Sequence, residues 1–281
     1  MFKLNAERFK YYLLLIRFFN QTGTILLFIP CFLGIIHSNS LNFRNFFLFF
    51  VCSFLARSCG CILNDIADKK IDAQTPTTAH RVLSSNKIMQ KNALYLLAFI
   101  ILASLPLLFL FSKHILPPLL ISGIFVIIYP YSKRFFPVPQ LFLGITYASG
   151  FIIASVHGSD APFYTLSSHT FLIYLALILW VVSYDTIYAK RDFSFDKINK
   201  IKASTVFFAS LKFPFIKNEM LRINCAIFLI YFVSNFVLFL ATHSIFPIIF
   251  NFALQIASIF VRPSLGFKLN ILCIIPMFFL V

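Results

Sequence analysis

The sequence has too few charged residues to cover a water-facing surface. Asp, Glu, Lys and Arg make up only 12% of its 281 residues, whereas 60% of the residues are apolar or aromatic and 39 are Phe. A soluble domain carries roughly 25% charged residues. The composition therefore excludes a soluble enzyme, and the high hydrophobicity excludes a disordered chain. Six Cys are too few for a disulfide-stabilised scaffold.

Long apolar runs are abundant, and they predict a polytopic membrane protein. A membrane-spanning helix needs about 20 apolar residues. A β-barrel would alternate apolar and polar residues along each strand, whereas these runs are continuously apolar, so we expect an all-α bundle. We expect nine spans, near Tyr12–Ile36, Phe46–Leu63, Ala93–Phe111, Ile115–Tyr129, Gln140–Val156, Thr170–Tyr188, Ile223–Thr242, Ile245–Val261 and Leu269–Val281.

The basic residues predict how this bundle is oriented. All of the 24 Lys and Arg residues except Arg44, Arg57 and Lys113 fall in the N-terminal segment or in the loops after the second, fourth, sixth and eighth spans. Because positive residues stay on the cytoplasmic side, we expect the N-terminus to be cytoplasmic. The net charge of +15 then reflects topology and contact with anionic lipid, and no nucleic-acid-binding module is visible.

The acidic residues are few and clustered. There are nine, and six of them lie at the predicted cytoplasmic ends of the second and sixth spans: Asp65, Asp68 and Asp72, then Asp185, Asp192 and Asp196. Helical periodicity of about 100° per residue places each cluster on one face, the first with Asn64 and the second with Tyr188. This placement in the second and sixth spans suggests a single domain of two similar halves, roughly 1–131 and 132–281.

Carboxylates that share one face repel one another unless a cation lies between them. Carboxylate oxygens at this spacing suit Mg²⁺, which leaves its remaining coordination positions to water and to substrate phosphates. The two clusters therefore predict two magnesium-binding faces around one diphosphate. The alternative is a solvated rim in which these acids pair with nearby basic residues: Lys69, Lys70, Lys190 and Arg191.

Four ordered motifs resemble those of the UbiA superfamily of intramembrane aromatic prenyltransferases. The resemblance covers roughly residues 10–205. It rests on an opening Gly23-Thr24-Ile25-Leu26-Leu27, an N-D-x-x-D-x-x-x-D run from Asn64 to Asp72, Tyr129-Pro130-Tyr131-Ser132-Lys133-Arg134, and Tyr184-Asp185-Thr186-Ile187-Tyr188-Ala189 followed by Asp192 and Asp196. The opening and the last motif are most similar to members that prenylate 4-hydroxybenzoate in ubiquinone synthesis.

The resemblance implies a Mg²⁺-dependent transfer of a polyprenyl group from polyprenyl diphosphate to an aromatic acid acceptor. It implies that the prenyl diphosphate is held through Mg²⁺ by Asn64, Asp65, Asp68, Asp72, Asp192 and Asp196. It implies phosphate-binding roles for Arg57, Lys133, Arg134 and Arg81. Arg17 is then a candidate for the acceptor carboxylate, with a plain interfacial anchor as the alternative. Asp185 and Tyr188 are candidates to orient or deprotonate the acceptor, and a hydrogen bond between them that stiffens the sixth span is the alternative.

Two features leave other interpretations open at this stage. Thr77 stands where the family commonly has a second Arg, and Val82 replaces the usual Pro, so a catalytically inactive scaffold remains a hypothesis. Intramembrane acids also occur in ion-coupled transporters, which is a second alternative.

Arg57 lies within a span, where a charge is costly unless it faces a cavity or an anion. The alternative is that it stabilises Asp65 or the helix-end carbonyls. We expect a multi-pass protein of the bacterial inner membrane, with the mitochondrial inner membrane as the alternative. Members of the family that act on a naphthoate or on haem remain alternative activities.

Overall fold

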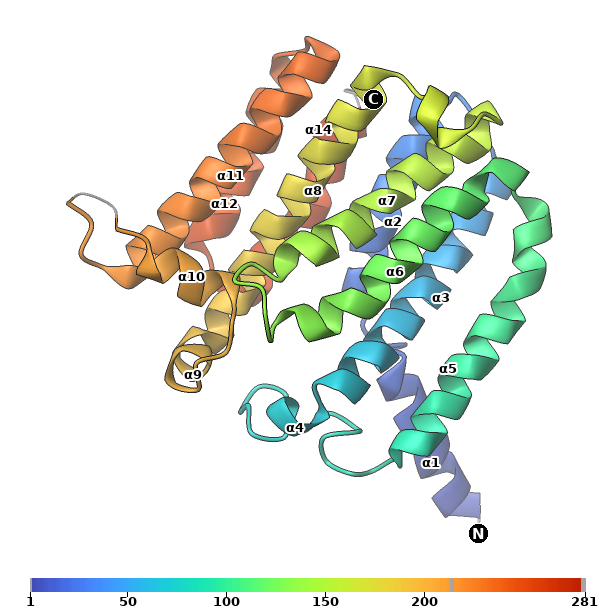
Figure 1. Ribbon diagram of the computed structural model, residues 1–281, viewed down its shortest axis with the longest axis vertical. Coiled ribbons are helices and arrows are strands. Elements are labelled where there is room, and N and C mark those ends of the chain that lie inside the picture. Colours follow the sequence, from blue (N-terminus) through green and yellow to red (C-terminus); the bar gives the residue numbers. More distant parts are fainter. Residues whose placement is uncertain (1, 213–214, 279–281) are drawn as a thin grey trace.

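The computed structural model describes residues 2–212 and 215–278, and within these ranges every regular element is helical (Figure 1). This confirms the all-α prediction. The α-helices are α1 Phe2–Leu15, α2 Thr22–His37, α3 Phe43–Ala67, α4 Lys69–Asp72, α5 Gln90–Ser104, α6 Leu116–Ser132, α7 Gln140–Ser159, α8 Ser168–Ala189, α9 Phe193–Ile198, α10 Ser204–Ser210, α11 Glu219–Thr242, α12 Phe246–Phe260, α13 Pro263–Leu269 and α14 Ile274–Phe278. Short 3₁₀ turns connect some of them: η1 Leu105–Leu110, η2 Lys113–Ile115, η3 Phe163–Thr165, η4 Lys190–Asp192 and η5 Asn270–Cys273.

Polar residues begin three of the long helices. The side chains of Asn42, Ser167 and Asn218 each accept a hydrogen bond from the backbone N–H three residues further on, at 2.9, 3.3 and 3.1 Å. A helix leaves its first amide groups without partners, and such a cap satisfies one of them. The starts of α3, α8 and α11 are therefore encoded locally.

Six segments are long and apolar enough to cross a membrane, so the chain is a multi-pass membrane protein. They are α3, α5 with η1, η2 with α6, α7, α8 with η4 and α9, and α11. Three further apolar helical segments are shorter, at Thr22–His37, Phe246–Phe260 and Pro263–Met277.

Two of the nine predicted spans need correction. Tyr12–Ile36 is not one helix, because α1 ends at Leu15 and α2 begins at Thr22. Arg17 between them has φ 59°, in the left-handed region that a continuing α-helix excludes. The last predicted span, Leu269–Val281, is divided among α13, η5 and α14, and its residues 279–281 lie outside the described part of the chain.

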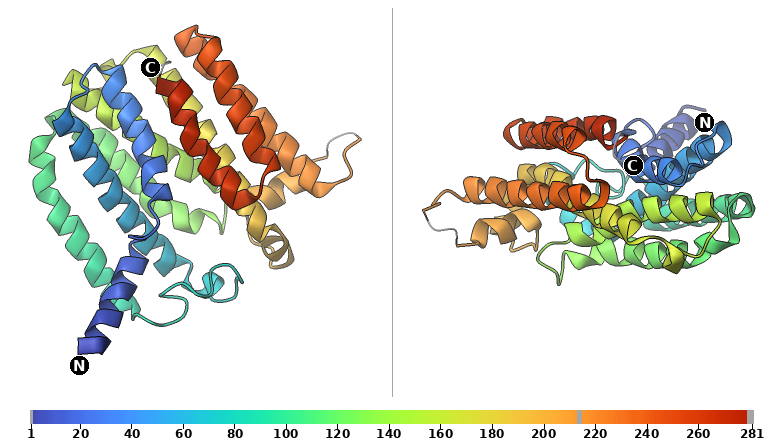
Figure 2. Two further views of the ribbon diagram at one scale, coloured as in Figure 1. Left: turned by 180° about the vertical axis from the view of Figure 1, so that it is seen from behind. Right: turned by 90° about the horizontal axis from the view of Figure 1, so that it is seen from above.

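The helices pack side by side, and α7 and α8 form the centre of the bundle. α8 packs against α7 and α11, and α2 packs against α7. A Cβ atom at Gly34 would lie 2.4 Å from the Phe151 carbonyl oxygen, so only glycine allows α2 to approach α7 this closely. Small residues serve this purpose at helix contacts in membranes. α2 lies behind α7 in Figure 1 and is seen from its other side in Figure 2.

A buried polar network holds the C-terminal helices against α8. The Trp180 indole N–H donates to Asn270 Oδ1 at 3.1 Å, and the Tyr231 hydroxyl donates to the same oxygen at 2.8 Å. Asn270 in turn donates to the Gly266 carbonyl at 2.9 Å. Fully paired polar groups are stable in an apolar interior. The network therefore places α13, which contributes Phe267 to the cavity described next.

Candidate active site

Both acidic motifs line one cavity of about 850 Å³. α4 and α9, which carry part of these motifs, lie at the same end of the bundle in Figure 1. The predicted site residues on the cavity wall are Arg17, Arg57, Asn64, Asp65, Asp68, Asp72, Arg81, Lys133, Asp185, Tyr188, Asp192 and Asp196. The tertiary structure thus brings together two clusters that are more than a hundred residues apart in the sequence.

The first motif forms one nearly continuous helical face. Asn64 and Asp65 lie in the last turn of α3, Asp68 follows it, and Asp72 ends α4. The Asp68 N–H donates to the Asn64 carbonyl at 2.9 Å, and the Asp72 N–H donates to the Asp68 carbonyl at 2.8 Å. Because this i to i−4 bonding runs through the junction, the acids share a face, as their spacing predicts.

Basic side chains from three other segments neutralise this face. Arg17 Nη2 donates to both carboxylate oxygens of Asp65, at 2.7 and 2.9 Å. Arg81 Nη1 lies 2.7 Å from Asp72 Oδ2 and 3.3 Å from Asp65 Oδ1. Lys133 forms an ion pair with Asp68 Oδ2. The alternative of a solvated rim, in which the acids pair with adjacent basic residues, does not describe these three carboxylates. They are buried, and the ion pairs they form are with Arg17, Arg81 and Lys133.

The second motif lines the same cavity as the first. Asp192 is in η4 and Asp196 is in α9. Thr77, in the loop after the first motif, donates a hydrogen bond to Asp192 Oδ1 at 2.5 Å, and Arg191 Nε lies 3.2 Å from Asp192 Oδ2. Thr77 therefore joins the loop after the first motif to the second motif. The sequence marked Thr77 only as a departure from the family pattern, and its role was missed.

The oxygen atoms present fit a hard divalent cation such as Mg²⁺. Asn64 Oδ1 and Asp68 Oδ1 are buried and have no hydrogen-bond partner among the described residues. Buried polar atoms are normally paired, so two unpaired acceptors on a cavity wall indicate a place for a cation or a donor. Within the described residues, however, no three Asp, Glu, His or Cys side chains already converge on one point. Binding a cation here requires the Lys and Arg partners to give way.

Burial also affects the protonation of this face. It raises the pKa of Asp72 above its usual range, against the opposing effect of the Arg81 guanidinium. Desolvation disfavours the charged carboxylate, which explains the direction of the shift. Asp72 therefore takes up a proton at a higher pH than an exposed Asp does.

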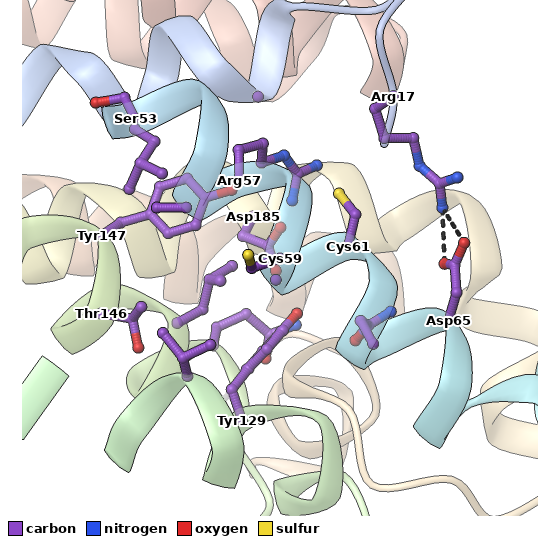
Figure 3. Close-up of a pocket in the computed structure, with 18 of the residues that line it drawn as sticks. Arg17, Ser53, Arg57, Cys59, Cys61, Asp65, Tyr129, Thr146, Tyr147 and Asp185 are labelled. Atoms are coloured by element: carbon purple, nitrogen blue, oxygen red, sulfur yellow. Dashed lines mark hydrogen bonds and ion pairs between the residues drawn. The ribbon is translucent and has the colours of Figure 1, made fainter. Parts of the chain in front are cut away.

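Arg57 lies deeper in the cavity and pairs with none of these acids. Asn64 is seven residues further along α3, or roughly 10 Å along the helix axis. Figure 3 shows Arg57 among Tyr147, Cys61 and Asp185, apart from the Arg17–Asp65 pair. No ion pair joins Arg57 to a carboxylate within residues 2–212 and 215–278. The alternative that it stabilises Asp65 is therefore wrong, since Arg17 and Arg81 fill that role.

The wall of α2 is shaped around this guanidinium. A Cβ atom at Gly23 would lie 2.5 Å from Arg57 Nε, so the absence of a side chain at Gly23 provides the space. A cation in an apolar wall is costly unless it faces an anion or a cavity. Arg57 is therefore the basic group of this site that is best placed to bind an anionic group of a ligand.

Asp185 and Tyr188 both face the cavity from α8. Gln140, at the start of α7, lines the same cavity. The Tyr188 ring lies 4.0 Å from the Arg191 guanidinium and 4.8 Å from the Phe267 ring. Among the described contacts there is no Asp185–Tyr188 hydrogen bond, so the interpretation of this pair as a stiffening bond gains no support.

Arg134 is the one predicted site residue that is not on the cavity wall. Its Nη2 donates to the Ala67 carbonyl at 3.1 Å, and its guanidinium stacks over the Tyr131 ring. A carbonyl at a helix C-terminus lacks an internal partner, which explains this contact. Arg191 and Phe267, which contact Tyr188, were missed as site residues, and Phe267 lies beyond the part of the sequence that carries recognisable motifs.

Known proteins are similar to this chain in sequence or in fold. A 4-hydroxybenzoate octaprenyltransferase from Neisseria meningitidis serogroup B is 34% identical over 209 residues, covering 72% of this chain and 68% of that protein. A protein of the same name from Francisella tularensis subsp. novicida is 33% identical over 217 residues, covering 76% and 74%.

Two solved structures share the fold at low identity. The apo structure of a UbiA homolog from Aeropyrum pernix K1 has a TM-score of 0.73 at 21% identity, covering 90% of this chain and 94% of that one. A UbiA homolog from Archaeoglobus fulgidus bound to GPP and Mg²⁺ has a TM-score of 0.67 at 15% identity, covering 96% and 99%. The model of the UbiA prenyltransferase family matches residues 27–267. With its two acidic motifs facing one intramembrane cavity, the chain belongs to the UbiA prenyltransferase family.

Proposed function

We propose that this protein transfers a polyprenyl group from polyprenyl diphosphate to 4-hydroxybenzoate, a step of ubiquinone biosynthesis, with Mg²⁺ as its cofactor. The observation that carries the proposal is that both acidic motifs line the same cavity, together with many apolar side chains. The names of the relatives from Neisseria and Francisella support the acceptor. The GPP and Mg²⁺ bound to the Archaeoglobus homolog support the donor and the metal.

The acidic end holds the diphosphate. Asn64, Asp65, Asp68, Asp72, Asp192 and Asp196 are the metal-binding residues that we propose. Magnesium bound there supplies positive charge that stabilises the leaving diphosphate. The unpaired oxygens of Asn64 and Asp68 support this assignment, because they are acceptors without a donor.

Lys133 and Arg81 complete the diphosphate site. Both now pair with acids of the first motif. When those acids bind a divalent cation, the two basic side chains are free to bind phosphate oxygens instead. Positive groups aimed at the leaving diphosphate stabilise the charge that develops as the bond between carbon 1 and oxygen breaks.

The deeper part of the polar site binds the acceptor. Arg57 has no carboxylate partner, and we assign it to the carboxylate of 4-hydroxybenzoate rather than to the diphosphate, because it lies about two helical turns beyond Asn64. Arg17, which is held by Asp65 at the rim, positions that acid and the turn before α2. An aromatic wall that includes Tyr147 and Tyr129 faces the same space.

The transfer forms one carbon–carbon bond and breaks one carbon–oxygen bond. Carbon 1 of the prenyl chain leaves the diphosphate and is attacked by the ring carbon next to the acceptor hydroxyl. That ring carbon then loses its proton. Asp185 is the group that we propose to orient the acceptor hydroxyl and to accept a proton, and Tyr188, fixed by Arg191 and Phe267, forms the adjacent wall.

We also propose the topology that the basic residues indicate. The shorter segments α2, α12 and α13–α14 would join the six long ones as nine crossings of the bacterial inner membrane, with the N-terminus and both acidic motifs on the cytoplasmic side. Two related halves, 1–131 and 132–281, remain part of this proposal. The alternatives of an ion-coupled carrier and an inactive scaffold are not retained, because the acids surround a cavity that fits a diphosphate.

The test is a transfer assay with the full-length protein in lipid nanodiscs. It contains Mg²⁺, labelled octaprenyl diphosphate and a panel of aromatic acids: 4-hydroxybenzoate, a dihydroxynaphthoate and benzoate. We expect prenylated 4-hydroxybenzoate, and we expect EDTA or Asp192→Ala to abolish it. A protein that stays folded and consumes another acceptor would contradict the acceptor assignment. A folded protein with no product from any acceptor would contradict the activity.

A further inference from the structure

The cavity runs as a shaft along α3 and α7 and stops before the far ends of both helices. α3 contributes lining residues from Asp65 back to Phe49, and α7 contributes them from Gln140 to Ile153. The stretches of these helices beyond Phe49 and Ile153, residues 43–48 and 154–159, do not line it. On α7, the next turn carries His157, whose ring contacts Phe49.

Three ring side chains from three segments close this end. The Phe49 and Phe111 rings are 5.2 Å apart and nearly perpendicular, and the His157 imidazole lies behind both, at 5.6 Å from Phe49 and 5.2 Å from Phe111. Phe49 is 3% exposed. We call this cluster of Phe49, Phe111 and His157 the floor.

Hydrogen bonds hold the floor in place. The Ser112 backbone N–H donates to His157 Nδ1 at 3.1 Å, and His157 Nε2 lies 3.2 Å from Asn45 Oδ1. The Ser112 hydroxyl donates to Asp160 at 2.5 Å, which also joins the segment after η1 to the end of α7. A ring held from both of its nitrogens is a rigid stop rather than a mobile side chain.

We propose that the floor determines how many isoprene units of the donor the protein recognises, an inference that rests on the proposed function. The shaft wall from Asn64 to Phe49 spans 15 residue steps of α3, or roughly 22 Å. An extended isoprene unit has four main-chain bonds of about 1.5 Å each and spans roughly 5 Å. The shaft therefore accommodates about four units. A longer tail turns at the floor and leaves sideways into the bilayer past η1, where Leu105 lines the shaft and is 47% exposed.

The test is a chain-length series. Transfer to 4-hydroxybenzoate is measured in nanodiscs with prenyl diphosphates of two, three, four, five and eight units, and kcat/KM is plotted against length. We expect kcat/KM to rise by about threefold or more per unit through added packing contacts, and then to become flat at about four units. The length at which the curve flattens is the break.

Substitutions in the floor should move the break in opposite directions. Phe111→Ala and Phe49→Leu remove ring volume and should move it to longer donors, whereas Phe111→Trp adds volume and should move it to shorter ones. Phe109→Ala is the control, since Phe109 is 93% exposed in η1 and does not line the shaft. It should leave the curve unchanged.

The possible outcomes separate this inference from the proposed function. If no donor length gives prenylated product, the proposed function fails. If product forms but the curve has no break, or the break is the same in wild type and all three floor variants, the inference is overturned. An equal loss of activity at every length in the floor variants also overturns it, because this is the result of a purely structural role.

Discussion

Arg57→Leu is the substitution that best tests how the polar site is divided. Arg57 lines the cavity without a carboxylate partner within the described residues, and its guanidinium fits against Gly23. Replacing it with Leu breaks no ion pair among the described residues, because Asp65 pairs with Arg17 and Arg81 instead. We therefore expect the melting temperature of the variant to equal or exceed that of the wild type.

The expected loss is in acceptor binding. A hydrogen bond between charged groups contributes about 1.5–3 kcal/mol. If Arg57 binds the acceptor carboxylate, Arg57→Leu should lower kcat/KM for 4-hydroxybenzoate by about 10- to 150-fold, at about 1.4 kcal/mol per factor of ten. The KM for the prenyl diphosphate should change by less than about threefold, because its diphosphate is held by the acidic motifs roughly 10 Å away.

The measurement combines both Michaelis constants with a thermal melt in the same nanodiscs. Arg57→Lys is a matched variant that keeps the charge but not the paired N–H groups, and it should fall between the wild type and Arg57→Leu. A rise in the KM for the prenyl diphosphate with an unchanged KM for 4-hydroxybenzoate would refute the division and place Arg57 on the diphosphate. A lower melting temperature with both constants unchanged would remove Arg57 from the site.

Three further predictions concern the acidic face. Arg17→Leu should lower the melting temperature, because Asp65, which is 1% exposed, loses its 2.7 and 2.9 Å contacts at a cost of about 1–3 kcal/mol. Adding Asp65→Asn should recover most of this loss, and no recovery would contradict the pairing. Asp68→Ala should abolish turnover in a folded protein. The control Glu219→Ala removes an exposed acid outside the cavity and should keep turnover. Activity of Asp68→Ala within about tenfold of wild type would contradict a metal role. As the pH is lowered from neutral, the apparent affinity for Mg²⁺ should weaken at a higher pH than it would with exposed carboxylates, since burial raises the pKa of Asp72 and the proton competes with the metal. The KM for Mg²⁺ measured against pH tests this. An unchanged KM down to the usual titration range of Asp would refute it.

The sequence by itself determined the class of protein and the composition of the site. Scarce charge and continuous apolar runs leave a helical membrane bundle as the outcome, since the bilayer requires every backbone group to be paired. The spacing of Asn64, Asp68 and Asp72 placed them on one face, because the helical period is a local property of the chain. That face continues through the end of α3 into α4.

Only the tertiary structure decided which groups meet. Thr77 and Asp192 are 115 residues apart and share a hydrogen bond, and Arg17 reaches Asp65 across 48 residues. The pattern of the chain also predicted one continuous first span, whereas the helix breaks at Arg17. The side chain of this same residue pairs with Asp65. Periodicity determines the face on which a side chain lies, but the partner depends on which helices become neighbours, and that is set by the packing of the whole bundle.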